Sequence, residues 1–206
     1  EIDGLNKLKT ALEAGKLAKS VELAEEEQEM LKDLFLLTSK PFIYIANVAE
    51  SQIENMENDE NVAKVKELAK QENTKCIPLC AKIEEELSDL DDEDRQMFLE
   101  DLGVSTSGLD RLVKEAYDLL GLATFFTAGE KECRAWTFKK GMKAPECAGI
   151  IHSDFEKGFI KAETYSYDDL MTYGTPQKVK EAGRVRLEGK EYVVQDGDIM
   201  LFRFNN

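Results

Sequence analysis

The sequence predicts an α/β domain that is preceded by a helical segment and followed by a small α+β domain. Two short apolar runs, residues 42–46 and 76–80, flank an amphipathic stretch. This is the pattern of a strand–helix–strand unit with parallel strands. After Gly121 the chain changes to short apolar runs with glycine turns, which is typical of a hairpin-rich sheet. With 206 residues, 42% of them hydrophobic, the chain is long enough to bury a core.

The first 39 residues predict a pair of helices with one solvated side. Leu5, Leu8 and Leu12 share one helical face, and a second apolar set follows the acidic run 25–29. That set consists of Leu31, Leu34 and Phe35. We interpret the acidic run as the solvated start of the second helix, where carboxylates favour the helix dipole. A binding site for a specific partner is the alternative.

The α/β part is predicted in the following order. A buried strand follows Lys40-Pro41, contains residues 42–46, and ends at Asn47. An amphipathic helix then leads to the second strand, residues 76–80. Two further helices are expected within residues 92–102 and at about 109–120, the second of them with Ser107 as its N-cap and Gly121 as its stop.

The part after Gly121 is predicted to contain several short strands around one helix. The expected elements are a hairpin of strands 124–127 and 132–138, a helix over 145–155, and strands 159–165, 191–194 and 199–204. Asp196-Gly197 is expected to form the tight turn before the last strand.

Charge is distributed unevenly along the chain. The 27 basic and 42 acidic residues give a net charge of −15. Up to Gly121 there are 14 basic and 29 acidic residues, and after it 13 of each. The negative net charge argues against a protein that binds the nucleic-acid phosphate backbone in general. This argument does not apply to the second part, which has no net charge.

Several protein classes are excluded by composition. The sequence contains no apolar run near the ~18 residues of a membrane-spanning helix, and its charged start is not a signal peptide. The four cysteines lack the spacing of a zinc site and are too few for a disulfide scaffold. We therefore expect free thiols, a cytoplasmic protein and no membrane partner.

Two loops follow the predicted parallel strands, and ligands of such sheets bind beyond the carboxyl ends of the strands. The first loop contains Asn47 and Glu50, and the second begins at Cys80. An asparagine amide and a nearby carboxylate could together read a nucleobase. From spacing alone, the alternative is that Asn47 caps the next helix.

Three ordered segments, residues 36–50, 151–163 and 194–200, resemble the YchF-type Obg-family ATPases. The resemblance extends over essentially the whole chain. It implies a P-loop nucleotidase with a helical insertion and a C-terminal TGS domain of ubiquitin-like β-grasp form, found in the cytosol and associated with ribosomes. On this basis residues 1–39 are part of the helical, coiled-coil-type insertion, 40–121 are the C-terminal half of the nucleotidase domain, and 122–206 are the TGS domain.

The resemblance also implies a base-binding site. The family's base-recognition motif ends in glutamate where the usual GTPase motif has aspartate, and Asn47 to Glu50 follows that departure. This implies a preference for ATP, with GTP as the alternative, and with Mg²⁺ in the complete protein. The residues expected to bind the base are Asn47, Val48, Glu50, Cys80 and Ala81.

No Gly-x-x-x-x-Gly-Lys-Ser/Thr sequence is present, so these residues include no phosphate-cradling P-loop. We therefore expect this chain to be the C-terminal portion of a longer protein, which alone neither binds ATP tightly nor hydrolyses it. The alternative is a non-enzymatic adaptor that contains a TGS domain and binds a ribosome, RNA or protein.

Ribosome contact is expected through rRNA or ribosomal proteins, and no DNA is expected as a partner. The candidate contacts are Arg134, Lys139, Lys140 and Lys143, which lie next to Trp136 and Phe138. We interpret the two aromatic residues as core and the lysines as the better contacts. The only histidine, His152, is interpreted as a satisfied helix-end imidazole. The acidic run 84–94 is interpreted as a solvated helix connection, because its spacing does not fit an EF-hand.

Overall fold

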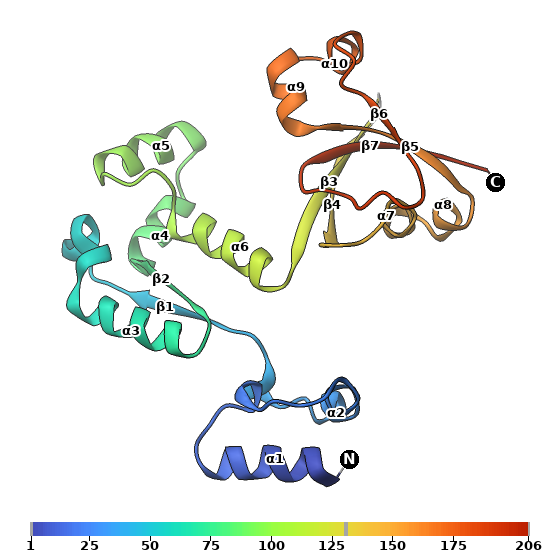
Figure 1. Ribbon diagram of the computed structural model, residues 1–206. Helices are drawn as coiled ribbons and strands as arrows, with labels where there is room; N and C mark the ends of the chain where they lie inside the picture. Colours follow the sequence, from blue (N-terminus) through green and yellow to red (C-terminus); the bar gives the residue numbers. More distant parts are fainter. Residues whose placement is uncertain (1, 130–131, 206) are drawn as a thin grey trace. The chain divides into compact units, whose positions relative to one another are not determined.

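The structure is a computed structural model that describes residues 2–129 and 132–205. The chain forms two compact units, with the boundary between Leu119 and Leu120 (Figure 1). The first unit contains helices α1 and α2 and an α/β part built on two strands. The second contains a five-stranded sheet with four helices. Within the described ranges, no helix is both long enough and apolar enough to cross a bilayer.

The first unit begins with the predicted pair of helices, α1 (Ile2–Glu13) and α2 (Glu25–Leu31). Leu8 is buried, and the acidic run forms the first turn of α2 as predicted. The second apolar set does not share one helical face, because α2 ends at Leu31. A 3-10 turn, Lys32–Leu34, follows it, and Phe35 has a left-handed φ of 48° and is 74% exposed.

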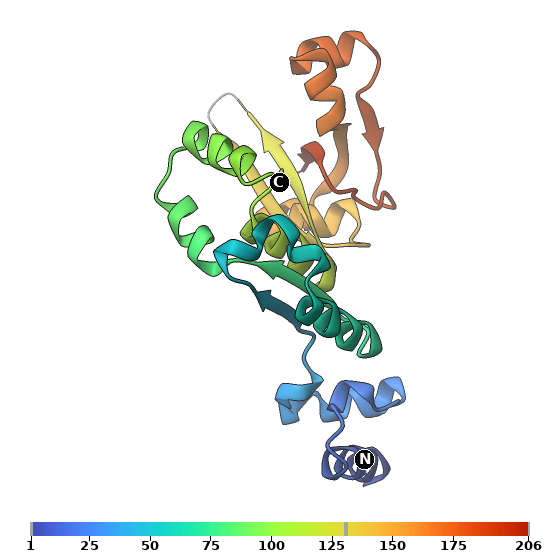
Figure 2. The same ribbon diagram turned by 90° about the vertical axis from the view of Figure 1, so that its left-hand side faces the viewer.

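The strand–helix–strand prediction is confirmed. Strand β1 (Ile43–Asn47) pairs in parallel with β2 (Lys75–Leu79), and helix α3 (Glu60–Gln71) connects them (Figure 2). Helix α3 begins where it does because the Asp59 carboxylate accepts hydrogen bonds from two amides of its first turn. The register pairs Asn47 with Leu79, so both strands end at the same level.

The segment after β2, which was expected to be a loop, forms a helix. Helix α4 (Ala81–Ser88) begins directly after Cys80, and it buries Ile83 and Leu87 in a cluster with side chains of the segment after β1, of α3 and of α5. The first half of the acidic run is therefore a packed helix, and only its other face is solvated. Helices α5 (Asp92–Asp101) and α6 (Gly108–Leu119) are present as predicted. The Ser107 hydroxyl caps α6 by accepting from the Asp110 amide at 3.0 Å.

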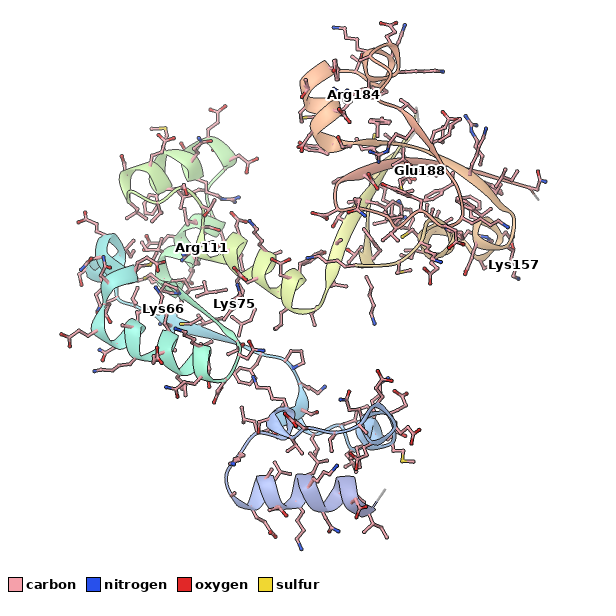
Figure 3. The ribbon with its side chains drawn as sticks, viewed as in Figure 1. Lys66, Lys75, Arg111, Lys157, Arg184 and Glu188 are labelled. Carbon is pink, nitrogen blue, oxygen red and sulfur yellow. The ribbon has the colours of Figure 1, made fainter. Side chains whose placement is uncertain are left out.

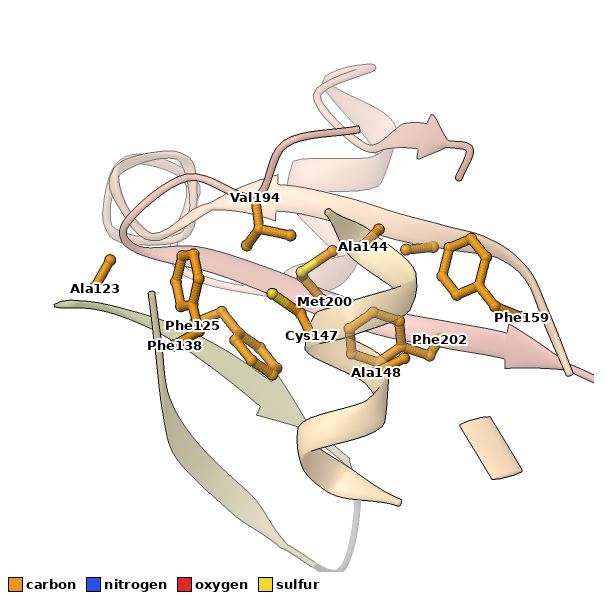
Figure 4. Packing of buried hydrophobic residues seen from close by; sticks show 11 residues of the cluster. Ala123, Phe125, Phe138, Ala144, Cys147, Ala148, Phe159, Val194, Met200 and Phe202 are labelled. Carbon is orange, nitrogen blue, oxygen red and sulfur yellow. The ribbon is translucent and has the colours of Figure 1, made fainter. Parts of the chain in front are cut away.

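The second unit is a sheet with strand order β4-β3-β7-β5-β6. Its strands are β3 (Leu122–Ala128), β4 (Cys133–Lys139), β5 (Phe159–Ser166), β6 (Arg186–Glu188) and β7 (Asp198–Phe204). The β3–β4 hairpin is confirmed, and β3 pairs in parallel with β7. Helix α7 (Ala144–Ile151) packs small side chains against the phenylalanines of one sheet face, which forms the core (Figure 4).

Two predictions for this unit are wrong. The helix expected over 145–155 is divided into α7 and α8 (Ser153–Lys157), because His152 has extended backbone angles and caps α8 instead. Residues 191–194 are not a strand. Their main chain pairs with the turn before α7, where the Ala144 amide donates to the Tyr192 carbonyl and the Val194 amide to the Met142 carbonyl.

One of the two edge strands is β6, and two unpredicted helices precede it. These are α9 (Tyr167–Tyr173) and α10 (Pro176–Glu181). Each has a side-chain cap at its start: the Ser166 hydroxyl accepts from Asp169, and the Thr175 hydroxyl accepts from Lys178.

Candidate functional site

The two loops at the carboxyl ends of β1 and β2 lie against each other. The Ala81 amide donates to the Asn47 Oδ1 atom at 2.9 Å, and the Val48 amide donates to the Leu79 carbonyl at 2.9 Å. Asn47 therefore caps a helix, but the helix is α4, the one that follows β2. The alternative prediction, that Asn47 caps the next helix along the chain, is therefore wrong about which helix is capped.

The contact with Ala81 fixes the orientation of the Asn47 amide. The main-chain N–H of Ala81 needs an acceptor, so the side-chain oxygen of Asn47 points to Ala81 and the side-chain nitrogen of Asn47 points away from it. Among residues 2–129 and 132–205, no acceptor is bound to this nitrogen. Its two N–H groups are therefore available to donate to a ligand.

Glu50 forms an ion pair with Lys82, the second residue of α4. Both side chains are partly exposed, 48% for Glu50 and 64% for Lys82. A second carboxylate, that of Glu86, lies 3.9 Å from the Lys82 ammonium. The hydrogen bond that the Lys82 ammonium donates to Glu50 raises the pKa of Lys82 above its ordinary value. The Glu50 carboxylate thus has a cation beside it, which it shares with Glu86.

Val48 and Cys80 contribute main chain and core packing rather than exposed side chains. Both are buried, with exposed fractions of 8% and 6%, and both belong to the hydrophobic cluster beneath the loops. Asn47, Glu50 and Ala81 are exposed at the same edge. The structure therefore brings together all five residues that were predicted to bind a base, three of them on the surface.

Behind the loops, α6 is held by side chains that the sequence analysis did not single out. Glu84 of α4 accepts hydrogen bonds from the amides of Gly108, at 2.7 Å, and Leu109, at 3.1 Å. It thereby caps the start of α6, where a carboxylate also favours the helix dipole. An Asp or Glu that faces a helix start 24 residues away leaves no local signal in the sequence.

A second set of contacts joins α6 to β2 and to the segment after β1. Arg111 donates to the Pro78 carbonyl and, at 3.1 Å, to the Glu57 carboxylate. Lys66 of α3 also pairs with Glu57, and Figure 3 shows Lys66 and Arg111 approaching from their two helices. These two cations lower the pKa of the Glu57 carboxyl, Lys66 having the larger effect. The cluster fixes the scaffold that positions the loops.

The candidate ribosome contacts lie on and after edge strand β4. Phe138 is 2% exposed, so its interpretation as core is confirmed. Trp136 is partly buried, stacks on Phe125, and donates its indole N–H to the Thr127 hydroxyl at 2.9 Å. The Arg134 guanidinium covers this indole at 4.1 Å from the ring centroid. Trp136 is therefore packed against Phe125 and Arg134 and belongs only partly to the core.

The lysines of this region differ in their surroundings. Lys139 ends β4 and is exposed. The Lys140 amide donates to the Gly121 carbonyl at 2.8 Å. The Lys143 ammonium pairs with Glu191 at 2.5 Å, which raises the pKa of Lys143 and offsets its charge. The charge of Lys143 is therefore offset by a neighbour, whereas Arg134, Lys139 and Lys140 are exposed.

Two further residue groups have structural roles. His152 accepts from the Asp154 amide at 3.2 Å through Nδ1, as expected of a helix-end imidazole. The four cysteines are unpaired. Within the described part of the chain, no group of three or more His, Cys, Asp or Glu side chains could hold a metal ion.

Comparisons with known proteins show what the chain is similar to. Residues 122–205 match a protein-family model described as YchF-GTPase_C, protein of unknown function (DUF933). The chain is 62% identical over 205 residues to "Ribosome-binding ATPase YchF" of Bacillus subtilis (strain 168), covering 100% of this chain and 56% of the relative. It is 45% identical to the protein of the same name from Escherichia coli O157:H7, with the same coverage.

A solved structure has the same fold. "Structure of the Schizosaccharomyces pombe YchF GTPase" superimposes with a TM-score of 0.82 at 33% identity, covering 98% of this chain and 53% of that one. The chain spans about half the length of the curated relatives it matches and corresponds to their C-terminal part. Together, these matches show that the chain belongs to the YchF family.

Proposed function

We propose that this chain supplies the base-binding loops and the C-terminal domain of a ribosome-associated, cytoplasmic ATPase. The observation that supports the proposal most directly is the hydrogen bond between Asn47 and Ala81. It joins two loops at the carboxyl end of a parallel strand pair, which is where ligands of such sheets bind. It also leaves the Asn47 amide N–H groups directed outward, where they can donate to a purine ring nitrogen.

The other parts of the proposal follow from the family. Relatives are named ribosome-binding ATPases, and we assign the same activity and partner to the full-length gene product. In that product, residues 40–121 form the base-binding half of a P-loop nucleotidase, residues 1–39 part of a helical insertion, and residues 122–206 a TGS domain of β-grasp form. ATP bound with Mg²⁺ supplies the phosphoryl chemistry, and Asn47, Glu50 and the main chain at Val48 and Cys80-Ala81 hold the base. Without a P-loop, this chain alone binds ATP only weakly.

Ribosome contact is assigned to Arg134 and Lys139, with Lys140 and Lys143 as secondary contacts. Arg134 presents a charged, planar group against an aromatic ring, and Lys139 is exposed at the other end of β4. Both suit a phosphate-rich RNA surface. Co-sedimentation with ribosomes should weaken in an Arg134→Ala, Lys139→Ala double variant, and more so at raised salt. Unchanged co-sedimentation would assign the contact to another surface.

The base site is tested with two substitutions of Asn47 in the full-length gene product. Asn47→Ala removes both the contact with Ala81 and the amide donors. Asn47→Asp keeps an acceptor toward Ala81, removes the donors and adds a negative charge. Both should weaken ATP binding at least tenfold, which corresponds to ~1.4 kcal/mol.

The matched control is Asn58→Ala, an exposed asparagine of the same unit whose amide donates only to Asn55. It should leave the affinity for ATP unchanged. If Asn47→Asp binds ATP as tightly as the unmodified protein, the base is not held by Asn47. If the full-length product neither binds nor hydrolyses ATP, the non-enzymatic adaptor becomes the better description.

A further inference from the structure

The ion pair between Glu50 and Lys82 changes what the base-binding edge can recognise. This inference rests on the proposed function, because it concerns the choice between purine bases at that site. A carboxylate without a neighbour offers two acceptor oxygens. Beside the Lys82 ammonium, the Glu50 carboxylate becomes one half of a pair that presents a donor next to an acceptor.

The two purines place different groups on the edge that such a pair would meet. Guanine has adjacent donors there, its N1–H and its 2-amino group, and these fit a free carboxylate. Adenine has the acceptor N1 next to the 6-amino donor, and this fits an ammonium beside a carboxylate. The surroundings of Glu50 therefore match the edge of adenine better than that of guanine.

A second contact acts in the same direction. Guanine has a carbonyl oxygen at position 6, which needs a donor, whereas adenine has an amino group there. The Ala81 amide is the main-chain donor at the start of α4, and it is already bound by the Asn47 Oδ1 atom at 2.9 Å. A 6-oxo group would have to displace that bond to gain a donor, whereas a 6-amino group is itself a donor and does not need the Ala81 amide.

We propose that Lys82 determines the base specificity of the site, by holding the Glu50 carboxylate in an ion pair that accepts a 6-aminopurine and rejects a 6-oxopurine. Lys82 is a specificity-determining residue in this proposal, and no chemical step depends on it. Because the pair lies on the surface, substitution of Lys82 should leave the fold intact, since exposed ion pairs contribute little to stability.

The test measures the affinities of the full-length gene product for ATP, GTP and ITP by displacement of a fluorescent nucleotide. Lys82→Met releases the Glu50 carboxylate. The ratio of GTP affinity to ATP affinity should then rise about fivefold or more, because a charged acceptor replaces a neutralised one. A fivefold change corresponds to ~1 kcal/mol. ITP lacks the 2-amino group, so its gain should be smaller than that of GTP.

Two variants serve as controls. Lys82→Arg retains the positive charge and should retain the ratio of the unmodified protein. Lys75→Met removes a lysine that is also 64% exposed and ion-paired, with Glu115 at 3.4 Å, but it lies at the opposite end of β2. It should leave the ratio unchanged.

The possible results are distinct. An unchanged ratio in Lys82→Met overturns this proposal, whether or not both affinities fall together. An increase in Lys75→Met of the same size also overturns it, because the effect would then be one of general charge. Failure of the unmodified protein to bind any nucleotide, or normal binding in Asn47→Asp, contradicts the proposed function instead.

Discussion

Asp198 is expected to be the most important single polar residue for the stability of residues 120–206. Its carboxylate is 2% exposed and accepts from the Tyr192 hydroxyl at 2.7 Å and from the Gln195 amide at 2.9 Å. Arg186 lies 3.4 Å away. Asp198→Ala would leave the partly buried Tyr192 hydroxyl and Gln195 amide without their acceptor, which is a costly arrangement.

The size of the effect follows from these contacts. Each hydrogen bond to a charged acceptor contributes roughly 1.5–3 kcal/mol. The Arg186 side chain is 48% exposed, and its ion pair adds less than ~1 kcal/mol. The variant no longer has to desolvate a carboxylate, which offsets part of the loss. We expect a net destabilisation of about 3 kcal/mol, which lowers the Tm of a domain of this size by more than ~10 °C.

Tryptophan fluorescence can measure this change for the second unit alone. Trp136 is the only tryptophan of the chain, and it is stacked on the buried Phe125. The control is Asp168→Ala, which removes an exposed carboxylate of the same unit. A Tm of Asp198→Ala within ~2 °C of the unmodified protein would refute the reasoning. So would full additivity with Tyr192→Phe, because residues that share a hydrogen bond should be coupled.

Two further predictions concern the first unit. Gly108→Ala should destabilise it by about 1–3 kcal/mol in urea unfolding, because the added Cβ would lie 2.5 Å from the Leu79 Cβ and 2.8 Å from the Glu84 carboxylate. The control, Gly189→Ala in the second unit, adds a Cβ with nothing within 4 Å and should cost far less. The amides at the start of α3 lower the pKa of Asp59, so its stabilisation is complete above the unfolded pKa, near ~4, and is lost as the pH falls through the lower folded value. Thermal melts of Asp59→Ala and the unmodified protein, followed by circular dichroism, should therefore differ at pH 7 and converge in acid; a constant difference would mean that the carboxylate is not responsible.

Elements with strong local signals were predictable from the sequence. The strands β1 and β2 are apolar runs of the expected length, and their connecting helix is amphipathic, so parallel pairing follows from topology. The β3–β4 hairpin follows from alternation and turn residues. The caps of α9 and α10, Ser166 and Thr175, are also local signals, and they could have identified these helices.

Other elements depend on contacts between distant residues. Helix α4 was not predicted because the acidic residues around Ile83 and Leu87 obscure an apolar pair at helical spacing. Strand β6 has three residues and no buried side chain, so alternation cannot reveal it. The apolar run at 191–194 resembles a strand, but its amides and carbonyls are used by the turn before α7.

The candidate site also combines residues that the sequence identifies with residues that only the fold brings together. Asn47 and Glu50 form a local motif and could be named from the sequence, whereas their partners Ala81 and Lys82 lie more than thirty residues away. Those partners are set by the register of the two strands, which aligns Asn47 with Leu79. In a parallel pair, shifting the register by one residue would turn the buried Ile77 and Leu79 to the other face of the sheet. The burial of these two side chains therefore also fixes which residues meet at the loops, so in the proposed site the choice of base depends on core packing as much as on the motif itself.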